Sequence, residues 1–80
     1  MKTITVRYFA GFRENAGLDE ETVSLDVATA ADLFRELSDR HGSTEPLGHC
    51  KVAVNEEMAD WGAELRDGDT VLLFPPVAGG

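Results

Sequence analysis

The last residues of the sequence could take part in chemistry on the main chain itself. The sequence ends with Phe74-Pro75-Pro76-Val77-Ala78-Gly79-Gly80. A terminal Gly-Gly has no side chains around its carboxylate, so it can enter a channel too narrow for other dipeptides, and its carbonyl carbon is open to attack from either face. We therefore take Gly80 as the candidate reactive group, with a frayed tail of no function as the alternative.

Side chains that could do chemistry elsewhere in the sequence are few. Cys50 follows His49, but neighbours on an extended segment point to opposite faces, so we expect a buried or half-buried thiol at a strand edge rather than a catalytic pair. His41 and His49 are too few and too far apart in sequence to indicate a metal site. Motifs for phosphate loops, dinucleotides, zinc proteases and serine hydrolases are absent from the sequence. We therefore expect this chain to bind no metal and no cofactor.

The composition indicates one small acidic domain. The chain has 80 residues, of which 42% are hydrophobic and 28% charged, as in an ordinary globular protein. Its formal net charge of −8 disfavours binding to nucleic acid. Both a partner with a basic docking face and simple solubility would account for this charge. The single cysteine fits a reducing cytoplasm, and no apolar run is long enough to span a membrane.

The best-defined element is a helix that begins after Thr29. Thr29 can accept a hydrogen bond as the N-cap, and Asp32 follows three residues later, close to the capping-box pattern. A single apolar stripe at helical spacing consists of Ala30, Leu33, Phe34 and Leu37. Arg40 and His41 fall in the last turn, where the helix dipole favours positive charge. Gly42 can end the helix in a left-handed conformation.

Strands are expected on both sides of this helix. Alternating apolar residues indicate strands at 3–9 and 22–26, which are close enough in sequence to pair antiparallel. Further strands are expected at 51–54 and, as a short edge strand, at 58–61. The continuous apolar run at 71–74 indicates a central strand buried on both faces, and two prolines end it.

The order of these elements, β-β-α-β-(β)-β, predicts an α+β fold in which one main helix covers one face of a mixed sheet of four to five strands. The most apolar strand belongs in the middle, where it would pair in parallel with the first strand. This is the ubiquitin-like β-grasp arrangement. We expect a folded domain at 1–74 and a flexible tail at 75–80 that, when extended, would reach roughly 20 Å.

Three large apolar side chains are expected away from the core. Phe9 falls on the face of its strand opposite to the other apolar residues, so it would lie on the open face of the sheet if those residues face the helix. Phe74 leads into the tail, and Met58 lies on the expected edge strand. Such a cluster beside a flexible tail could form a docking surface, and shielding of the second sheet face is the alternative.

The sequence resembles the MoaD family of ubiquitin-like sulfur carriers, the small subunits of molybdopterin synthase, over essentially all 80 residues. The resemblance is most specific in the ending Phe-Pro-Pro-Val-Ala-Gly-Gly. The segment Val-Arg-Tyr-Phe-Ala-Gly-Phe-Arg-Glu at 6–14 and the Ala-Val-Asn turn at 53–55 also match. The thiamin-pathway carrier ThiS shares the fold and the Gly-Gly ending but usually lacks the two prolines. Ubiquitin-like archaeal modifiers can carry the same ending.

The resemblance implies a sulfur carrier that is not an enzyme by itself. An E1-like enzyme similar to MoeB would use ATP to adenylate the carboxylate of Gly80, and sulfur transfer would convert it into a thiocarboxylate. The tail would then enter a large subunit similar to MoaE and donate sulfur to cyclic pyranopterin monophosphate, forming the dithiolene of molybdopterin. The residues that would thread into that site are Val77, Ala78 and Gly79. The residues that match the family's hydrophobic docking positions are Phe9, Met58 and Phe74.

Two other functions would use the same adenylation step. The chain could be a ubiquitin-like modifier that is conjugated to protein lysines through Gly80. It could also deliver sulfur for the synthesis of thiamin or for the thiolation of tRNA. In each case we expect a cytoplasmic protein with protein partners and no association with nucleic acid or membranes.

Overall fold

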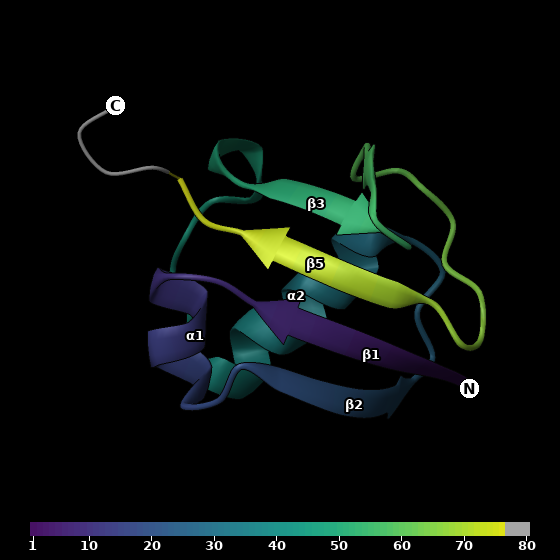
Figure 1. The fold of residues 1–80 in the computed structure, drawn as a ribbon, viewed down its shortest axis with the longest axis horizontal. Coiled ribbons are helices and arrows are strands. Elements are labelled where there is room, and N and C mark those ends of the chain that lie inside the picture. The colour runs from purple at the N-terminus through teal and green to yellow at the C-terminus, as the bar shows by residue number, and fades with distance from the viewer. Residues whose placement is uncertain (77–80) are drawn as a thin grey trace.

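The protein consists of a five-stranded sheet with its main helix packed behind it (Figure 1). The computed structural model describes residues 1–76. The strands are β1 Lys2–Tyr8, β2 Glu20–Leu25, β3 Lys51–Val54, β4 Glu57–Ala59 and β5 Thr70–Phe74. The helices are α1 Gly11–Ala16, α2 Ala30–His41 and the short 3-10 helix η1 Leu47–His49. The strand order β2-β1-β5-β3-β4 confirms the predicted β-grasp arrangement.

The last strand lies at the centre of the sheet, as its apolar sequence predicts. β5 pairs in parallel with β1 and antiparallel with β3. β1 also pairs antiparallel with β2, and β3 with β4. The mixed sheet and the edge position of β4 are therefore both confirmed, although β4 covers 57–59 rather than 58–61.

The caps of α2 follow the sequence prediction residue by residue. The Thr29 hydroxyl accepts a hydrogen bond from the backbone N–H of Asp32, and the Asp32 carboxylate accepts one from the N–H of Thr29, each at 3.3 Å. Backbone N–H groups of Ala28 and Thr29 hold the pKa of the Asp32 carboxyl below its usual value. Gly42 ends the helix with φ of 71°, a conformation that costs glycine little.

The core lies between α2 and the sheet face that α2 covers. The apolar stripe of the helix is buried there, together with inward residues of four strands. The largest side chains that are fully buried are Ile4, Leu33, Val6, Val52 and Val71. Neither α1 nor α2, the α-helices of residues 1–76, is long and apolar enough to cross a membrane.

Two further details differ from the sequence prediction. The glycines at 11 and 17 in the sequence indicate a loop with one turn of helix at 10–16, whereas the structure forms the six-residue helix α1 there, which buries Phe12 in the core. The strand β5 is buried on one face only. Val71 and Leu73 are buried, whereas Leu72 and Phe74 are half-buried, because no second layer of the described chain covers the other face of the sheet.

Candidate functional site

The sheet face opposite to α2 has an apolar half and a polar half. The register places Glu20, Arg7, Leu72, Ala53 and Met58 in one row across all five strands. On the side of this row toward the end of β5, Phe74 lies opposite Lys51. On the other side of this first row, the neighbouring row consists of Thr22, Thr5 and Thr70. The end of the sheet nearest the C-terminal tail is therefore the apolar one.

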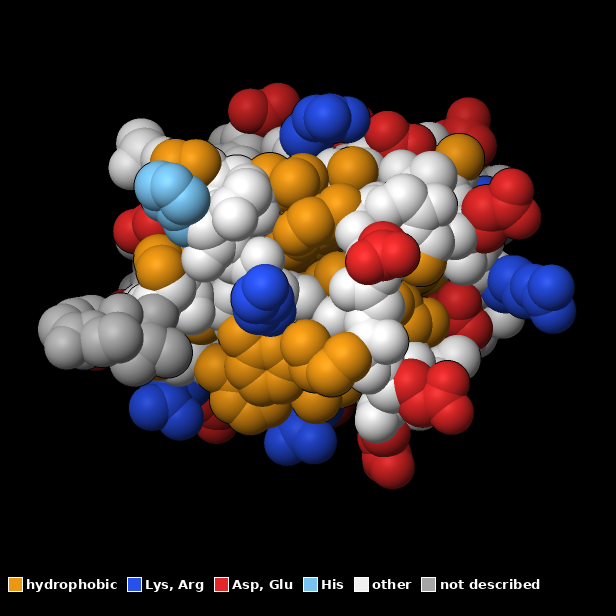
Figure 2. All heavy atoms as spheres, turned by 90° about the horizontal axis from the view of Figure 1, so that it is seen from above, with side chains coloured by type: hydrophobic (Ala, Val, Ile, Leu, Met, Phe, Trp, Pro, Cys, Tyr) orange, Lys and Arg blue, Asp and Glu red, His pale blue; other side chains and the backbone are white. Residues whose placement is uncertain are grey.

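Five side chains make up what we call the apolar patch. They are Phe9, Ala53, Met58, Leu72 and Phe74. Seen from above in Figure 2, the open face lies along the lower edge of the picture, where hydrophobic side chains gather next to Lys and Arg side chains. An exposed apolar patch on a small domain is a common mark of a protein-binding surface.

Phe9 and Phe74 form the end of the patch that is nearest the tail. Their rings stack with centroids 4.8 Å apart and planes 17° apart. Phe9 lies just after β1, where Ala10 turns the chain with φ of 49° and leads into α1. Both phenylalanines are half-buried. The prediction that Phe9 lies on the open face of the sheet is therefore confirmed.

Met58 forms the opposite end of the patch. It lies on the edge strand β4 across from Ala53, and 65% of its surface is exposed. Ala53 is buried although it faces away from α2, because it lies between Leu72 and Met58 in the same row. The structure thus brings the three predicted docking residues onto one face. Leu72 and Ala53 were missed, although strand alternation with Phe74 would have indicated Leu72.

The predicted reactive group and threading residues lie outside the described residues; these are Gly80, Gly79, Ala78 and Val77. The structure does show where the chain leaves the domain. β5 ends at Phe74, as predicted, and Pro75 and Pro76 continue from the apolar end of the open face. The tail therefore starts from the edge of the apolar patch.

Cys50 is a buried thiol, as the sequence predicts. Its side chain is only 2% exposed, and Sγ donates a hydrogen bond to the carbonyl oxygen of Pro46 at 3.3 Å. Burial raises the pKa of this thiol, and the charge of Glu45 raises it further. A protonated and buried thiol is a poor nucleophile, so Cys50 contributes to packing rather than to chemistry.

The other cluster of titratable side chains lies on the helix side of the sheet. The Glu21 carboxylate accepts a hydrogen bond from the Tyr8 hydroxyl at 2.5 Å and lies 2.5 Å from Nε2 of His41. Arg40 lies 3.8 Å from the same carboxylate. Burial alone would raise the pKa of Glu21, but the contacts with Tyr8, His41 and Arg40 hold it below its usual value. Burial and the hydrogen bond to Glu21 raise the pKa of Tyr8.

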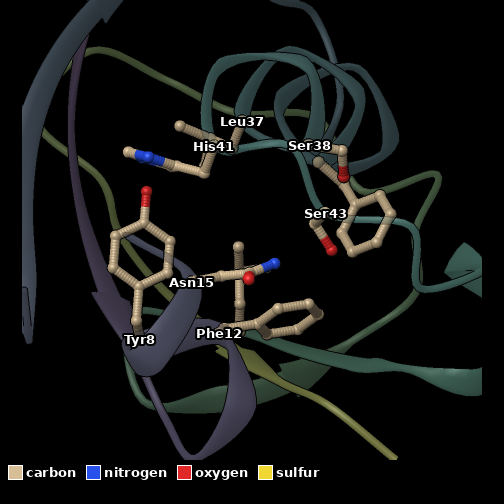
Figure 3. Close-up of a pocket in the computed structure, with 9 residues that line it drawn as sticks. Tyr8, Phe12, Asn15, Leu37, Ser38, His41 and Ser43 are labelled. Atoms are coloured by element: carbon tan, nitrogen blue, oxygen red, sulfur yellow. The ribbon is translucent and has the colours of Figure 1, made fainter. Parts of the chain in front are cut away.

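These contacts connect β1, β2 and the last turn of α2, so the cluster stabilises the fold. Figure 3 shows Tyr8 and His41 pointing toward one another beside a small hollow that Phe12 and Asn15 also line. The hollow has a volume of only about 20 Å³, which is room for roughly one water molecule. Within residues 1–76, no group of three or more acidic, histidine or cysteine side chains is arranged to hold a metal ion.

Comparison with known proteins shows that the chain is similar to small sulfur carriers and modifiers over nearly all of its length. Residues 6–80 match the model of the ThiS family. The molybdopterin synthase sulfur carrier subunit of Escherichia coli is 38% identical, over 96% of this chain and 99% of its own length. Small archaeal modifier protein 1 of Haloferax volcanii is 35% identical, over 92% of this chain and 97% of its own.

Solved structures agree with this result. A putative molybdopterin converting factor subunit 1 from Pyrococcus furiosus superposes with a TM-score of 0.84 at 39% identity, covering 96% of this chain and all of the other. A chain of the complex of subunits 1 and 2 of molybdopterin-converting factor from Helicobacter pylori has a TM-score of 0.66 at 30% identity, covering 98% of this chain and 99% of the other.

Proposed function

The chain belongs to the ThiS family, and from this premise we propose that it is the sulfur carrier subunit of a molybdopterin synthase. The observation that carries the proposal is the 38% identity with the Escherichia coli sulfur carrier subunit over nearly the full length of both chains. The apolar patch beside the start of the tail supports it, since a carrier must dock on a partner while it presents its terminus.

The chemistry would take place on the carboxylate of Gly80. A carboxylate is a poor electrophile because oxide is a poor leaving group, so an activating E1-like enzyme would first convert it into an acyl adenylate with ATP. A sulfur donor would then displace AMP and leave a thiocarboxylate. The absence of a side chain at Gly79 and Gly80 would allow this group to enter a narrow channel. This chain would be a sulfur-donating subunit and no enzyme by itself.

The large subunit would dock on the apolar patch. The Helicobacter pylori complex of subunits 1 and 2 is a precedent for such an assembly in a related protein. Phe9 and Phe74 would be the aromatic anchors of the interface, because their stacked rings present a rigid apolar surface next to the tail. The catalytic residues that act on the pterin would belong to the large subunit.

Conjugation to lysines is the second candidate, because Small archaeal modifier protein 1 is similar over 92% of this chain. Its identity and coverage are both somewhat lower than those of the Escherichia coli sulfur carrier. The sequence similarity therefore favours the sulfur carrier.

The intact mass of the protein purified from its own host tests the proposal. A thiocarboxylate makes the chain heavier by the difference in mass between a sulfur atom and an oxygen atom. Reconstitution with the large subunit and cyclic pyranopterin monophosphate should then yield molybdopterin. Gly-Gly remnants on lysines of other proteins, with no thiocarboxylate on the free chain, would favour conjugation instead.

A further inference from the structure

The open face of the sheet carries a different charge from the rest of the protein. The chain as a whole has a formal net charge of −8. On the open face, however, the charged side chains of the described strands are Arg7, Lys51 and Glu20. The Glu20 carboxylate lies 3.8 Å from Arg7, and both side chains are more than half exposed. Within the described strands, Glu20 is thus the one acidic side chain on this face, while Glu56 and Asp60 of the flanking loops line hollows beside Arg7 and Lys51.

The two cations lie on opposite sides of the apolar patch. Lys51 on β3 is the cross-strand neighbour of Phe74, and Arg7 on β1 is the neighbour of Leu72. Directly paired residues in neighbouring strands have Cβ atoms about 5 Å apart. Both cations are therefore next to large apolar side chains of the patch. In residues 1–76 no carboxylate lies within ion-pair distance of Lys51.

From this arrangement we infer that the surface of the large subunit that receives the apolar patch has carboxylates at its border, opposite Lys51 and Arg7. The inference rests on the proposed function, because it identifies the large subunit as the protein that docks on this face. It replaces the expectation of a basic docking face, which follows from the net charge of the chain alone.

The physical reason is the cost of covering a charge. A partner that encloses Phe74 must also approach the ammonium group of Lys51, which lies beside it. Removing water from a charge at an interface costs free energy when no partner replaces the water. A carboxylate facing the charge offsets this cost and also steers the two proteins together. A basic partner surface would place like charges together at this point, although the remaining acidic surface of the carrier would attract it from a distance.

The test is the affinity of the carrier for the large subunit of its own organism, measured by calorimetry with three carrier variants. Lys51→Glu reverses the charge at the patch, and Lys51→Arg keeps it. Arg35→Glu is the matched control, because Arg35 lies on α2 with its side chain 71% exposed and changes the net charge equally. Thermal unfolding of each free variant shows that the fold is retained, as expected for exposed positions.

We expect Lys51→Glu to weaken binding about tenfold or more near 0.1 M salt, where the screening length is about 10 Å, and considerably less near 1 M salt. Lys51→Arg and Arg35→Glu should bind within about twofold of the unmodified protein. Unchanged or tighter binding of Lys51→Glu, or an equal loss with Arg35→Glu, overturns the inference and leaves the proposed function intact. If the unmodified carrier does not bind the large subunit at all, the proposed function fails, and this inference fails with it.

Discussion

The rings of Phe9 and Phe74 stack nearly in parallel with centroids 4.8 Å apart, although the two residues are 65 positions apart in the sequence. The parallel pairing of β1 with β5 makes this contact, because Tyr8 lies opposite Leu73 and the next residue of each chain segment, Phe9 or Phe74, lies on the open face. The pair therefore connects the apolar patch to the strand from which the tail leaves the domain.

Replacing Phe9 by alanine should affect partner binding more than the fold. We expect a loss of about 2–4 kcal/mol in affinity for the large subunit, as for an aromatic anchor of an interface. The free energy of unfolding of the free domain should fall by only about 1 kcal/mol, because the Phe9 ring is half-buried and the substitution removes its stacking contact with Phe74. Calorimetric titration and urea unfolding measure the two quantities.

Phe12→Ala is the matched control for this experiment. Phe12 is 6% exposed and packs in the core, so its loss should cost about 3–5 kcal/mol of stability. If Phe9→Ala destabilises the domain as strongly as Phe12→Ala and leaves the affinity unchanged, Phe9 is a core residue and the docking surface lies elsewhere.

Met58→Asp should abolish docking while the domain remains folded. The side chain is 65% exposed, so a charge there should change the free energy of unfolding by less than about 0.5 kcal/mol. The same charge within an apolar interface would leave a carboxylate without water or a partner. Pull-down with the large subunit and thermal unfolding test this prediction. Leu18→Asp, at an exposed apolar residue outside the patch, should bind normally.

Deleting Gly80 should abolish thiocarboxylate formation without altering stability, because β5 ends at Phe74 and the core is complete before the tail. Adding a residue after Gly80 should have the same effect. Gly79→Ala should reduce the rate, since its Cβ must fit a channel sized for glycine. Mass spectrometry of the chain after incubation with the activating enzyme, ATP and a sulfur donor measures the product. A truncated or extended chain that still gains sulfur would contradict the carrier function.

Glu21→Gln should make the stability of the protein less sensitive to acid. The pKa of Glu21 is lower in the folded protein than its ordinary value of 4.5, so its contribution to stability is fully present above that value and is lost as the pH falls through the lower folded pKa. The difference in unfolding free energy between the unmodified protein and the variant should shrink as the pH falls below about 5.5. Urea unfolding at a series of pH values measures this difference.

Glu20→Gln provides the comparison, because it removes a charge from the same strand in an exposed pair with Arg7. It should change stability by less than about 1 kcal/mol. An acid profile of Glu21→Gln that runs parallel to that of the unmodified protein would show that folding does not lower the pKa of Glu21.

Thr29→Ala tests the start of α2. The substitution removes the hydroxyl that accepts the hydrogen bond from the N–H of Asp32 and should cost about 1 kcal/mol of stability. Thr29→Ser should retain most of that stability, because serine supplies the same hydroxyl. Thermal unfolding measures the stability of both variants. An equal loss of stability in the two would show that the hydroxyl of the cap is unimportant.

The sequence was sufficient to predict the elements whose signals are local. The caps at Thr29 and Gly42 and the apolar stripe between them define α2 without reference to any other part of the chain. The apolar run of β5, bounded by a turn and two prolines, also predicted the central position of that strand. Such signals are reliable because each arises from residues within a few positions of one another.

The features that the sequence could not predict depend on register between distant strands. Glu21 meets Tyr8 and His41 only after β2 pairs with β1 and α2 packs on both, and no local pattern indicates that contact. The charge of the open face has the same origin, because pairing places Lys51 beside Phe74. The half-exposed state of Leu72 was missed because an apolar run does not reveal that one of its faces has no covering layer.

The central position of β5 also has a mechanical consequence. This strand is hydrogen-bonded on both sides, to β1 and to β3, and the bonds run across the direction of the chain. A pulling force on the chain beyond Phe74 therefore acts in shear on the hydrogen bonds to both neighbouring strands. Many of these bonds must then break at the same time, whereas the bonds of an edge strand that is peeled away break one after another. A partner that draws the terminus into its own site should thus move the whole domain as one body instead of extracting the strand.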